Sequence, residues 1–207
     1  MSEEKWIHHC SHTQHQLKEV YSNTEFKCQV CNHEGEGTRY RCNPCDFAVH
    51  TICGTLPDCL SSFTHPEHQL SLRPKPFLIH KCRLCGDFVT GMVYRCEAAG
   101  CKFFLHPMCS QSPELLENHP CHPPHPLRLC SSASKKCDVC QEKCKHWRYH
   151  CDICDVHIHL PCLARKTTAS NAATGATAAS KGSDKAKFWT YIGRLADIAQ
   201  LMGDNLN

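Results

Sequence analysis

The sequence predicts three small, mostly β modules in tandem, followed by a linker and a short amphipathic helix. One cysteine and histidine pattern recurs three times along the 207 residues. Without its 20 cysteines the chain is only about 31% apolar, which is too little for one large shared core. The composition also changes sharply near residue 165. We expect modules at residues 8–56, 62–112 and 119–165, a linker at 166–184 and a helix at 185–203.

The repeat keeps one order of residues in every copy: a His-x2-His pair, a Cys-x2-Cys pair, ten residues, a second cysteine pair and a closing His-x2-Cys. The ten-residue gap is constant, and only the second copy widens its second pair, to Cys96-x4-Cys101. The first copy uses His12, His15, Cys28, Cys31, Cys42, Cys45, His50 and Cys53. The second uses His65, His68, Cys82, Cys85, Cys96, Cys101, His106 and Cys109. The third uses His122, His125, Cys137, Cys140, Cys151, Cys154, His159 and Cys162.

This pattern favours zinc over a disulfide framework. Two cysteines separated by two residues in a tight turn direct both sulfurs at one ion, and zinc accepts four such ligands tetrahedrally. The chain has 17 histidines, and nine of them recur at fixed places in the cysteine pattern, which disulfides do not require. Its first ten residues carry charges and no apolar run, so we expect no signal peptide and a cytoplasmic or nuclear location.

Two further sets of positions repeat with the cysteines. Gly35 and Gly37 in the first copy, and Thr90-Gly91 in the second, are typical of hairpin turns between strands. Aromatic or apolar residues lie two positions before the third cysteine and two after the fourth, and we expect them to form small cores: Tyr40, Tyr94, Tyr149, Phe47, Phe103 and Val156.

With these motifs, residues 12 to 162 resemble the divergent C1 (DC1) family of plants, a variant of the diacylglycerol-binding zinc domain of protein kinase C. The resemblance implies two interleaved zinc sites in each module, and therefore six zinc ions. The first cysteine pair would bind one ion with the closing His-x2-Cys, and the second pair would bind the other with the His-x2-His pair. The parent's last cysteine has no counterpart here, and we infer that His12 replaces it in the first module. Because four protein ligands close a zinc site, the metal is expected to be structural.

Five cysteines stay outside this ligand scheme. Three of them precede a His-x2-His pair and are alternative ligands, although their variable offsets favour ordinary thiols. The five are Cys10, Cys59, Cys121, Cys130 and Cys144.

Metal binding would change the formal net charge of +3. Fifteen ligand thiolates and six zinc ions bring the total to about zero, with about −3 on residues 1–164 and +3 on residues 165–207. The basic clusters Lys135-Lys136 and 143–148 favour a solvated face over a nucleic-acid groove.

The C-terminal segment predicts an amphipathic helix after an Ala, Thr, Ser and Gly linker. This helix would pack on the last module, dock on a partner, or lie at a membrane surface with help from Lys185 and Lys187. Its apolar face is Phe188, Ile192, Leu195, Ala199 and Met202.

For function, the sequence favours a non-enzymatic zinc adaptor that contacts proteins in signalling or stress response. No phosphate loop, nucleophile elbow or paired-carboxylate site is recognisable. Diacylglycerol binding is disfavoured, because the ten-residue segments lack the Gln-Gly element that the parent family uses for its lipid groove. Membrane association is the main alternative, ahead of nucleic-acid binding, redox chemistry and ubiquitin ligase activity.

Overall fold

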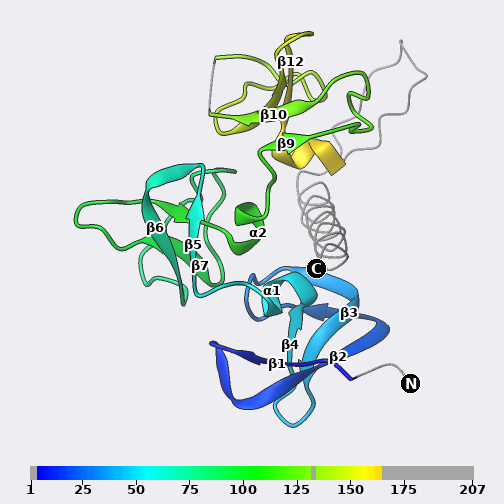
Figure 1. Ribbon diagram of the computed structural model, residues 1–207, viewed down its shortest axis with the longest axis vertical. Helices are drawn as coiled ribbons and strands as arrows, with labels where there is room; N and C mark the ends of the chain where they lie inside the picture. The colour runs from blue at the N-terminus through cyan, green and yellow to red at the C-terminus, as the bar shows by residue number, and fades with distance from the viewer. Residues whose placement is uncertain (1–3, 132–133, 165–207) are drawn as a thin grey trace, which may run out of the picture. The chain divides into compact units, whose positions relative to one another are not determined.

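The computed structural model of the chain describes residues 4–131 and 134–164 (Figure 1). Its three modules each contain one four-stranded sheet, and every strand pair is antiparallel. This agrees with the small, mostly β class predicted from the repeat. The predicted linker 166–184 and helix 185–203, with its apolar face, lie outside the described residues.

The first module is built on one long strand. Strands β1 (Trp6–His9), β2 (His12–Lys27), β3 (Glu34–Cys42) and β4 (Phe47–His50) pair in chain order. The four-residue helix α1 (Thr51–Gly54) follows β4 directly. The His-x2-His pair therefore lies at the start of β2, while the third cysteine ends β3.

The second module repeats this plan with shorter strands. Strands β5 (Cys59–Ser62), β6 (His65–Arg73), β7 (Val93–Cys96) and β8 (Phe104–Leu105) pair in chain order. Helix α2 (Pro107–Ser110) follows β8 after the closing histidine, and proline at its first position suits a helix start. The segment between β6 and β7 carries the first cysteine pair.

The third module has the same sheet order with a different helix at its end. Strands β9 (Leu115–Leu116), β10 (Leu127–Cys130), β11 (Arg148–Cys151) and β12 (Val156–His159) form a sheet with neighbours in the order β12-β11-β10-β9. A short 3-10 helix, η1 (Leu160–Ala164), follows β12. The closing histidine of each module thus lies at the end of its last strand or just beyond it.

The described residues fall into two compact units. One contains residues 4–82 and 87–111, and the other contains residues 83–86, 112–131 and 134–164. Within the described residues, no helix is long and apolar enough to cross a membrane.

The tyrosine two residues before the third cysteine is the core residue of each module, as predicted. Tyr40, Tyr94 and Tyr149 are at most 1% exposed. The Tyr94 hydroxyl donates to the Pro57 carbonyl at 2.6 Å, and Tyr149 makes the same bond to Pro113 at 2.7 Å. Tyr94 and Tyr149 therefore also fix the chain segments that lead into the second and third modules.

The prediction of a hairpin turn at Gly35 and Gly37 is wrong. Both glycines lie inside β3, which pairs with β2 as far as Phe26 opposite Gly35. The chain reverses earlier, because β2 is long enough to carry the pairing up to Lys27, next to the first cysteine. Gly37, at φ +84°, stands where the β2–β3 register shifts, which is the position of a bulge.

Candidate metal centres

In the first module, the first cysteine pair and the closing His-x2-Cys come together as one cluster. Cys28, Cys31, His50 and Cys53 place one potential ligand atom each within 4.8 Å of the others. The His50 Nδ1 atom lies 3.4 Å from the Cys31 sulfur and 3.7 Å from the Cys53 sulfur. We call this arrangement the closing-histidine site. It is largely buried, with Cys28 and Cys53 fully enclosed.

A tight turn shapes the cysteine pair of this site. The Asn32 N–H donates to the Cys28 carbonyl at 2.8 Å, and the Cys28 N–H donates to the His33 carbonyl at 2.9 Å. Asn32 has φ +61°, in the left-handed region that asparagine tolerates better than most residues. The residues after the corresponding pairs, Gly86 and Gln141, are also left-handed. This knuckle aims both sulfurs of the pair at one point.

A backbone carbonyl sets the tautomer of each closing histidine. The Nε2 atom of His50 lies 3.3 Å from the Glu34 carbonyl oxygen, so that Nε2–H is the donor. His106 and His159 lie 3.1 Å from the carbonyls of Phe88 and Lys143 in the same way. The Nδ1 lone pair is then left to face the thiols, which is how an outer hydrogen bond orients a metal-binding imidazole.

The closing-histidine site recurs in the other two modules. In both modules the four potential ligand atoms lie within 4.8 Å of one another. The residues are Cys82, Cys85, His106 and Cys109 in the second module, and Cys137, Cys140, His159 and Cys162 in the third. In the third module, the His159 Nδ1 atom lies 3.2 Å from the Cys140 sulfur.

The thiols and imidazoles of these sites shift one another's pKa strongly. Burial opposes ionisation of Cys28, but hydrogen bonds from Cys31, Cys53 and His50 hold its pKa well below the usual value. A hydrogen bond from Cys162 is the main reason that the pKa of Cys137 falls to about 3, against the effect of burial. Burial likewise opposes protonation of His50, yet Cys28 and Cys31 raise its pKa to about 10. Without metal, the lowered pKa values of Cys28 and Cys137 favour a thiolate in the clusters of the first and third modules.

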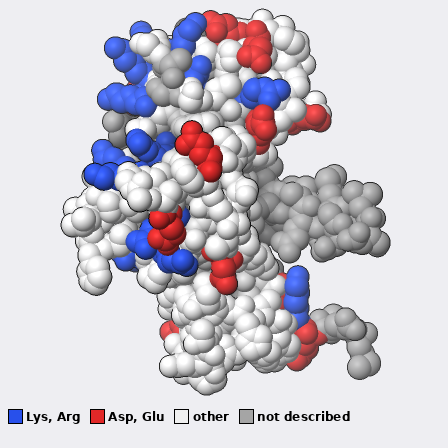
Figure 2. Space-filling model, turned by 60° about the vertical axis from the view of Figure 1, so that its left-hand side comes forward, with Lys and Arg blue, Asp and Glu red and all other residues white. Residues whose placement is uncertain are grey.

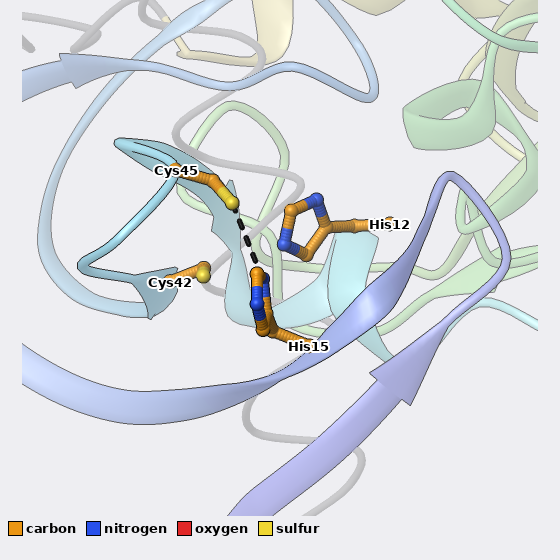
Figure 3. Close-up of side chains that lie close together, drawn as sticks. All are labelled: His12, His15, Cys42 and Cys45. Carbon is orange, nitrogen blue, oxygen red and sulfur yellow. Dashed lines mark hydrogen bonds between the residues drawn. The ribbon is translucent and has the colours of Figure 1, made fainter.

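The second cluster of the first module joins the histidine pair of β2 to the second cysteine pair (Figure 3). Figure 3 shows His12 and His15 projecting from β2 toward Cys42, at the end of β3, and Cys45, in the turn that follows. The Cys45 sulfur lies 3.2 Å from His15 Nδ1, and the four ligand atoms lie within 4.8 Å of one another. We call this arrangement the histidine-pair site.

The histidine-pair site of the third module has the same geometry. His122, His125, Cys151 and Cys154 form its cluster, and the Cys154 sulfur lies 3.2 Å from His125 Nδ1. Asp155, directly after Cys154, is left-handed like Asp46 after Cys45. The two sites are thus built on equivalent turns.

In the second module, the widened cysteine pair places Cys101 beside the first histidine of the His-x2-His pair, whereas Cys45 and Cys154 lie beside the second. The Cys101 sulfur lies 3.6 Å from His65 Nε2, and the rings of His65 and His68 are 5.4 Å apart. Gly100, left-handed at φ +78°, precedes Cys101 and lets the longer turn bring this cysteine back. Cys96 is the last residue of β7, equivalent to Cys42.

The chemistry of these clusters fits zinc. The Nε2 atoms of His12 and His122 are buried and have no hydrogen-bond partner among the described residues, a costly state that a metal ion would relieve. Phe47 stacks on His12 at 4.5 Å between ring centroids, and Phe103 stacks on His65 at 4.4 Å. These half-buried phenylalanines therefore hold the histidine rings in place. Four nitrogen and sulfur donors within 4.8 Å of one another suit tetrahedral zinc.

Comparison with known proteins agrees with this geometry. The family model of the C1 domain matches residues 10–54, 63–110 and 120–163. The chain belongs to the C1 domain family. C1 domains bind two zinc ions each, so three of them, with the clusters described above, are consistent with six zinc ions.

Two curated relatives contain segments similar to this C1 protein. It is 36% identical over 69 residues to probable nucleoredoxin 1 of Arabidopsis thaliana, covering 33% of this chain and 11% of the relative. It is 29% identical over 92 residues to diacylglycerol kinase theta of Homo sapiens, covering 40% of this chain and 9% of the relative. The chain thus spans only about a tenth of the length of either. No solved structure matches it.

The five additional cysteines of this C1 protein have varied surroundings. Cys10 and Cys59 are exposed, and Cys121 and Cys130 are half-buried. Cys144 is 2% exposed, and burial, followed by the nearby Cys137, raises the pKa of its thiol to about 11. Such a thiol is a poor nucleophile at neutral pH.

Sequence reasoning missed two features near these sites. His33 is half-buried, and burial together with the neighbouring His106 and His50 lowers its pKa to about 4. The segment Phe77-Leu78-Ile79 is almost fully exposed. The second feature had a visible signal, since three consecutive apolar residues lie between Lys75-Pro76 and His80-Lys81.

Proposed function

We propose that this C1 protein is a non-enzymatic adaptor whose zinc ions are structural and whose second module carries a docking loop. Four protein donors at each proposed site leave zinc no position for a reactive water, which supports a structural role for the metal. C1 domains bind diacylglycerol or proteins. The adaptor function, in intracellular signalling or stress response, rests on the exposed loop described next.

The docking loop, residues 74–81, joins β6 to the first cysteine pair of the second module. Phe77 is 108% exposed relative to an extended reference, Leu78 is 74% exposed and Ile79 is 82% exposed. Burying each such side chain on a partner is worth about 1.5–3 kcal/mol. Contiguous apolar patches of this kind mark interaction sites on soluble domains. The exposure of Phe77, Leu78 and Ile79 is the main support for the adaptor function.

Capture of binding proteins tests the loop directly. The double variant Phe77→Ser/Ile79→Ser removes two apolar side chains without touching a proposed ligand. We expect it to keep six zinc ions and to lose a reproducible set of proteins that the parent chain captures. The matched control is Ile153→Ser, since Ile153 is 72% exposed on the third module. If both variants capture the same proteins as the parent chain, the loop is not the docking site.

A membrane surface is the second candidate partner, and the charges around the loop favour it. The exposed Lys75 and Lys81 flank the apolar run, and Lys81 Nζ lies 5.1 Å above the ring of Phe88, itself 56% exposed. Apolar tips bordered by lysines suit the interface of an anionic bilayer. Similarity to diacylglycerol kinase theta agrees with this candidate.

Vesicle sedimentation separates the membrane candidate from the protein candidate. Vesicles of phosphatidylcholine with and without phosphatidylserine test for charge, and added diacylglycerol tests for the lipid that the sequence disfavours. Membrane binding predicts phosphatidylserine-dependent sedimentation that Phe77→Ser/Ile79→Ser abolishes and Ile153→Ser keeps. Equal sedimentation by both variants would exclude the loop as the membrane contact.

The charged surface of the third module argues against nucleic acid. On the face shown in Figure 2, lysine and arginine side chains gather over this module beside aspartate and glutamate side chains. Lys135 pairs with Asp155 at 2.8 Å, and Arg128 pairs with Glu114 at 2.7 Å. A groove for nucleic acid would present its cations unpaired.

A further inference from the structure

The first two modules meet at one surface inside the first compact unit, with the knuckle of the first module at its centre. The main-chain N–H of Met92, in the second module, donates to the carbonyl of Val30, in the first, at 2.7 Å. Val30 is fully buried, and Met92 is 8% exposed. Val30 stands between the two cysteines of the knuckle. A buried main-chain hydrogen bond at this point fixes the register of one module on the other.

Gly91 allows this close approach. A Cβ atom there would lie 2.3 Å from the Val30 carbonyl oxygen and 2.9 Å from the Cys31 carbonyl carbon. Both are backbone atoms, so no flexible side chain could move aside. Any residue larger than glycine at this position must therefore separate the modules or distort the knuckle.

The remaining contacts at this surface involve proposed zinc ligands of both modules. The Cys53 sulfur lies 3.8 Å from the Met108 sulfur, next to Cys109 in the chain. The ring centroids of His33 and His106 are 6.3 Å apart. One proposed ligand of each closing-histidine site thus contacts a side chain of the other module: Cys53 contacts Met108, and His106 contacts His33. The Tyr94–Pro57 hydrogen bond fixes the segment between the modules.

The same main-chain contact recurs within the second compact unit. There the Trp147 N–H donates to the Leu84 carbonyl at 3.2 Å. Trp147 lies four residues before the third cysteine of its module, as Met92 does, and Leu84 has the knuckle position of Val30. Leu84 is also buried, at 1% exposure. Two independent occurrences make the contact a property of the repeat.

We propose that this docking couples zinc binding in the first two modules, so that loss of zinc from one closing-histidine site weakens zinc binding at the other. Zinc holds the Cys28–Cys31 knuckle, and the knuckle presents the Val30 carbonyl to Met92. Without the ion, the zinc–sulfur bonds no longer stabilise this turn. The second module then loses its hydrogen-bonded contact with the Val30 carbonyl. Linkage then requires the reciprocal effect from the second module on the first. This coupling concerns metal retention and is independent of the docking loop.

Cadmium-113 substitution of the full chain tests the coupling site by site, because each bound ion gives its own NMR resonance. Cys28→Ser and Cys82→Ser assign the resonances of the two closing-histidine sites by deleting one each. A chelator titration then measures the affinity of the second-module site. We expect Cys28→Ser to weaken that site by a factor within the roughly 5- to 150-fold range of ordinary allosteric coupling.

The variant Gly91→Ala tests whether the coupling between the two zinc sites depends on the contact between the first two modules. In a Gly91→Ala background, Cys28→Ser should have no further effect on the second-module site, whereas in a Thr90→Ala background it should keep its full effect. Should Gly91→Ala not fold, His33→Ala removes a ring contact without a backbone clash and should reduce the coupling, with the exposed His8→Ala as its control. Unchanged affinity of the second-module site in Cys28→Ser would overturn the proposal.

Discussion

Gly35 packs its backbone directly against the imidazole of His50, where a Cβ atom would lie 2.3 Å from Nε2. The ring is held in this position because Nε2 also faces the Glu34 carbonyl at 3.3 Å. At the equivalent positions, seven residues before the third cysteine, the other modules carry Val89 and Cys144, which are both buried. The long strand β3 of the first module thus imposes a glycine requirement that the other modules do not share.

The substitution Gly35→Ala should therefore cost the first module its closing-histidine zinc. The new methyl group would clash with the Nε2 side of the His50 ring and displace the ring, so that Nδ1 could not keep its present distances to the Cys31 and Cys53 sulfurs. We expect five zinc ions per chain in place of six, measured by metal analysis after gel filtration. Glu36→Ala, at an exposed neighbouring position, should keep six. A Gly35→Ala protein with six zinc ions would contradict this account of the contact.

These glycines show where sequence reasoning succeeded and where it failed. The ligand spacing specified the metal clusters, because a Cys-x2-Cys knuckle is a local structure that its own residues determine. Gly35 and Gly37 suggested a turn, but the local signal could not reveal that β2 would extend to Lys27 and pair with them. The contact of Met92 with Val30 was equally invisible, since it depends on how two separate modules pack.

The hydroxyl of Tyr94 should contribute measurably to the stability of the second module. It donates to the Pro57 carbonyl at 2.6 Å from a fully buried ring, and a neutral hydrogen bond of this kind is worth about 1 kcal/mol. Tyr94→Phe should lower the free energy of unfolding of the zinc-loaded protein in denaturant by about that amount. Tyr21→Phe is the matched control, because Tyr21 is 73% exposed. Equal unfolding curves for the two variants would show that the bond adds nothing.

His12 should be required for zinc in the histidine-pair site of the first module. It lies within 4.8 Å of the other three potential ligands, measured between donor atoms, and its buried Nε2 atom has no hydrogen-bond partner among the described residues. His12→Ala leaves three donors and should lower the zinc content from six to five, or weaken one site severely. His8→Ala removes an exposed histidine nearby and should change nothing. Retention of six tightly bound zinc ions by His12→Ala would mean that another residue, such as Cys10, completes the site.

Acid should release zinc from the closing-histidine sites, and the sign follows from the shifted pKa values. In the metal-free first module, a hydrogen bond to Cys28 raises the pKa of Cys53 well above its ordinary value, and His50 has a pKa of about 10. Both groups therefore carry a proton at neutral pH that zinc must displace. The zinc-bound state holds fewer protons than the metal-free state, so its stability increases with pH and is lost as pH falls.

For each proton that zinc displaces, the zinc affinity should fall about tenfold when the pH is lowered by one unit. The affinity of a site that loses several protons on binding zinc should therefore decrease steeply from about pH 8 to about pH 6. Competition with a chromogenic chelator at several pH values measures this slope. A pH-indicator dye in weak buffer independently counts the protons released on zinc addition. The histidine-pair sites offer two thiols in place of three, and their zinc should show the shallower dependence. An affinity that stays constant over this pH range would contradict the proposed thiolate ligands.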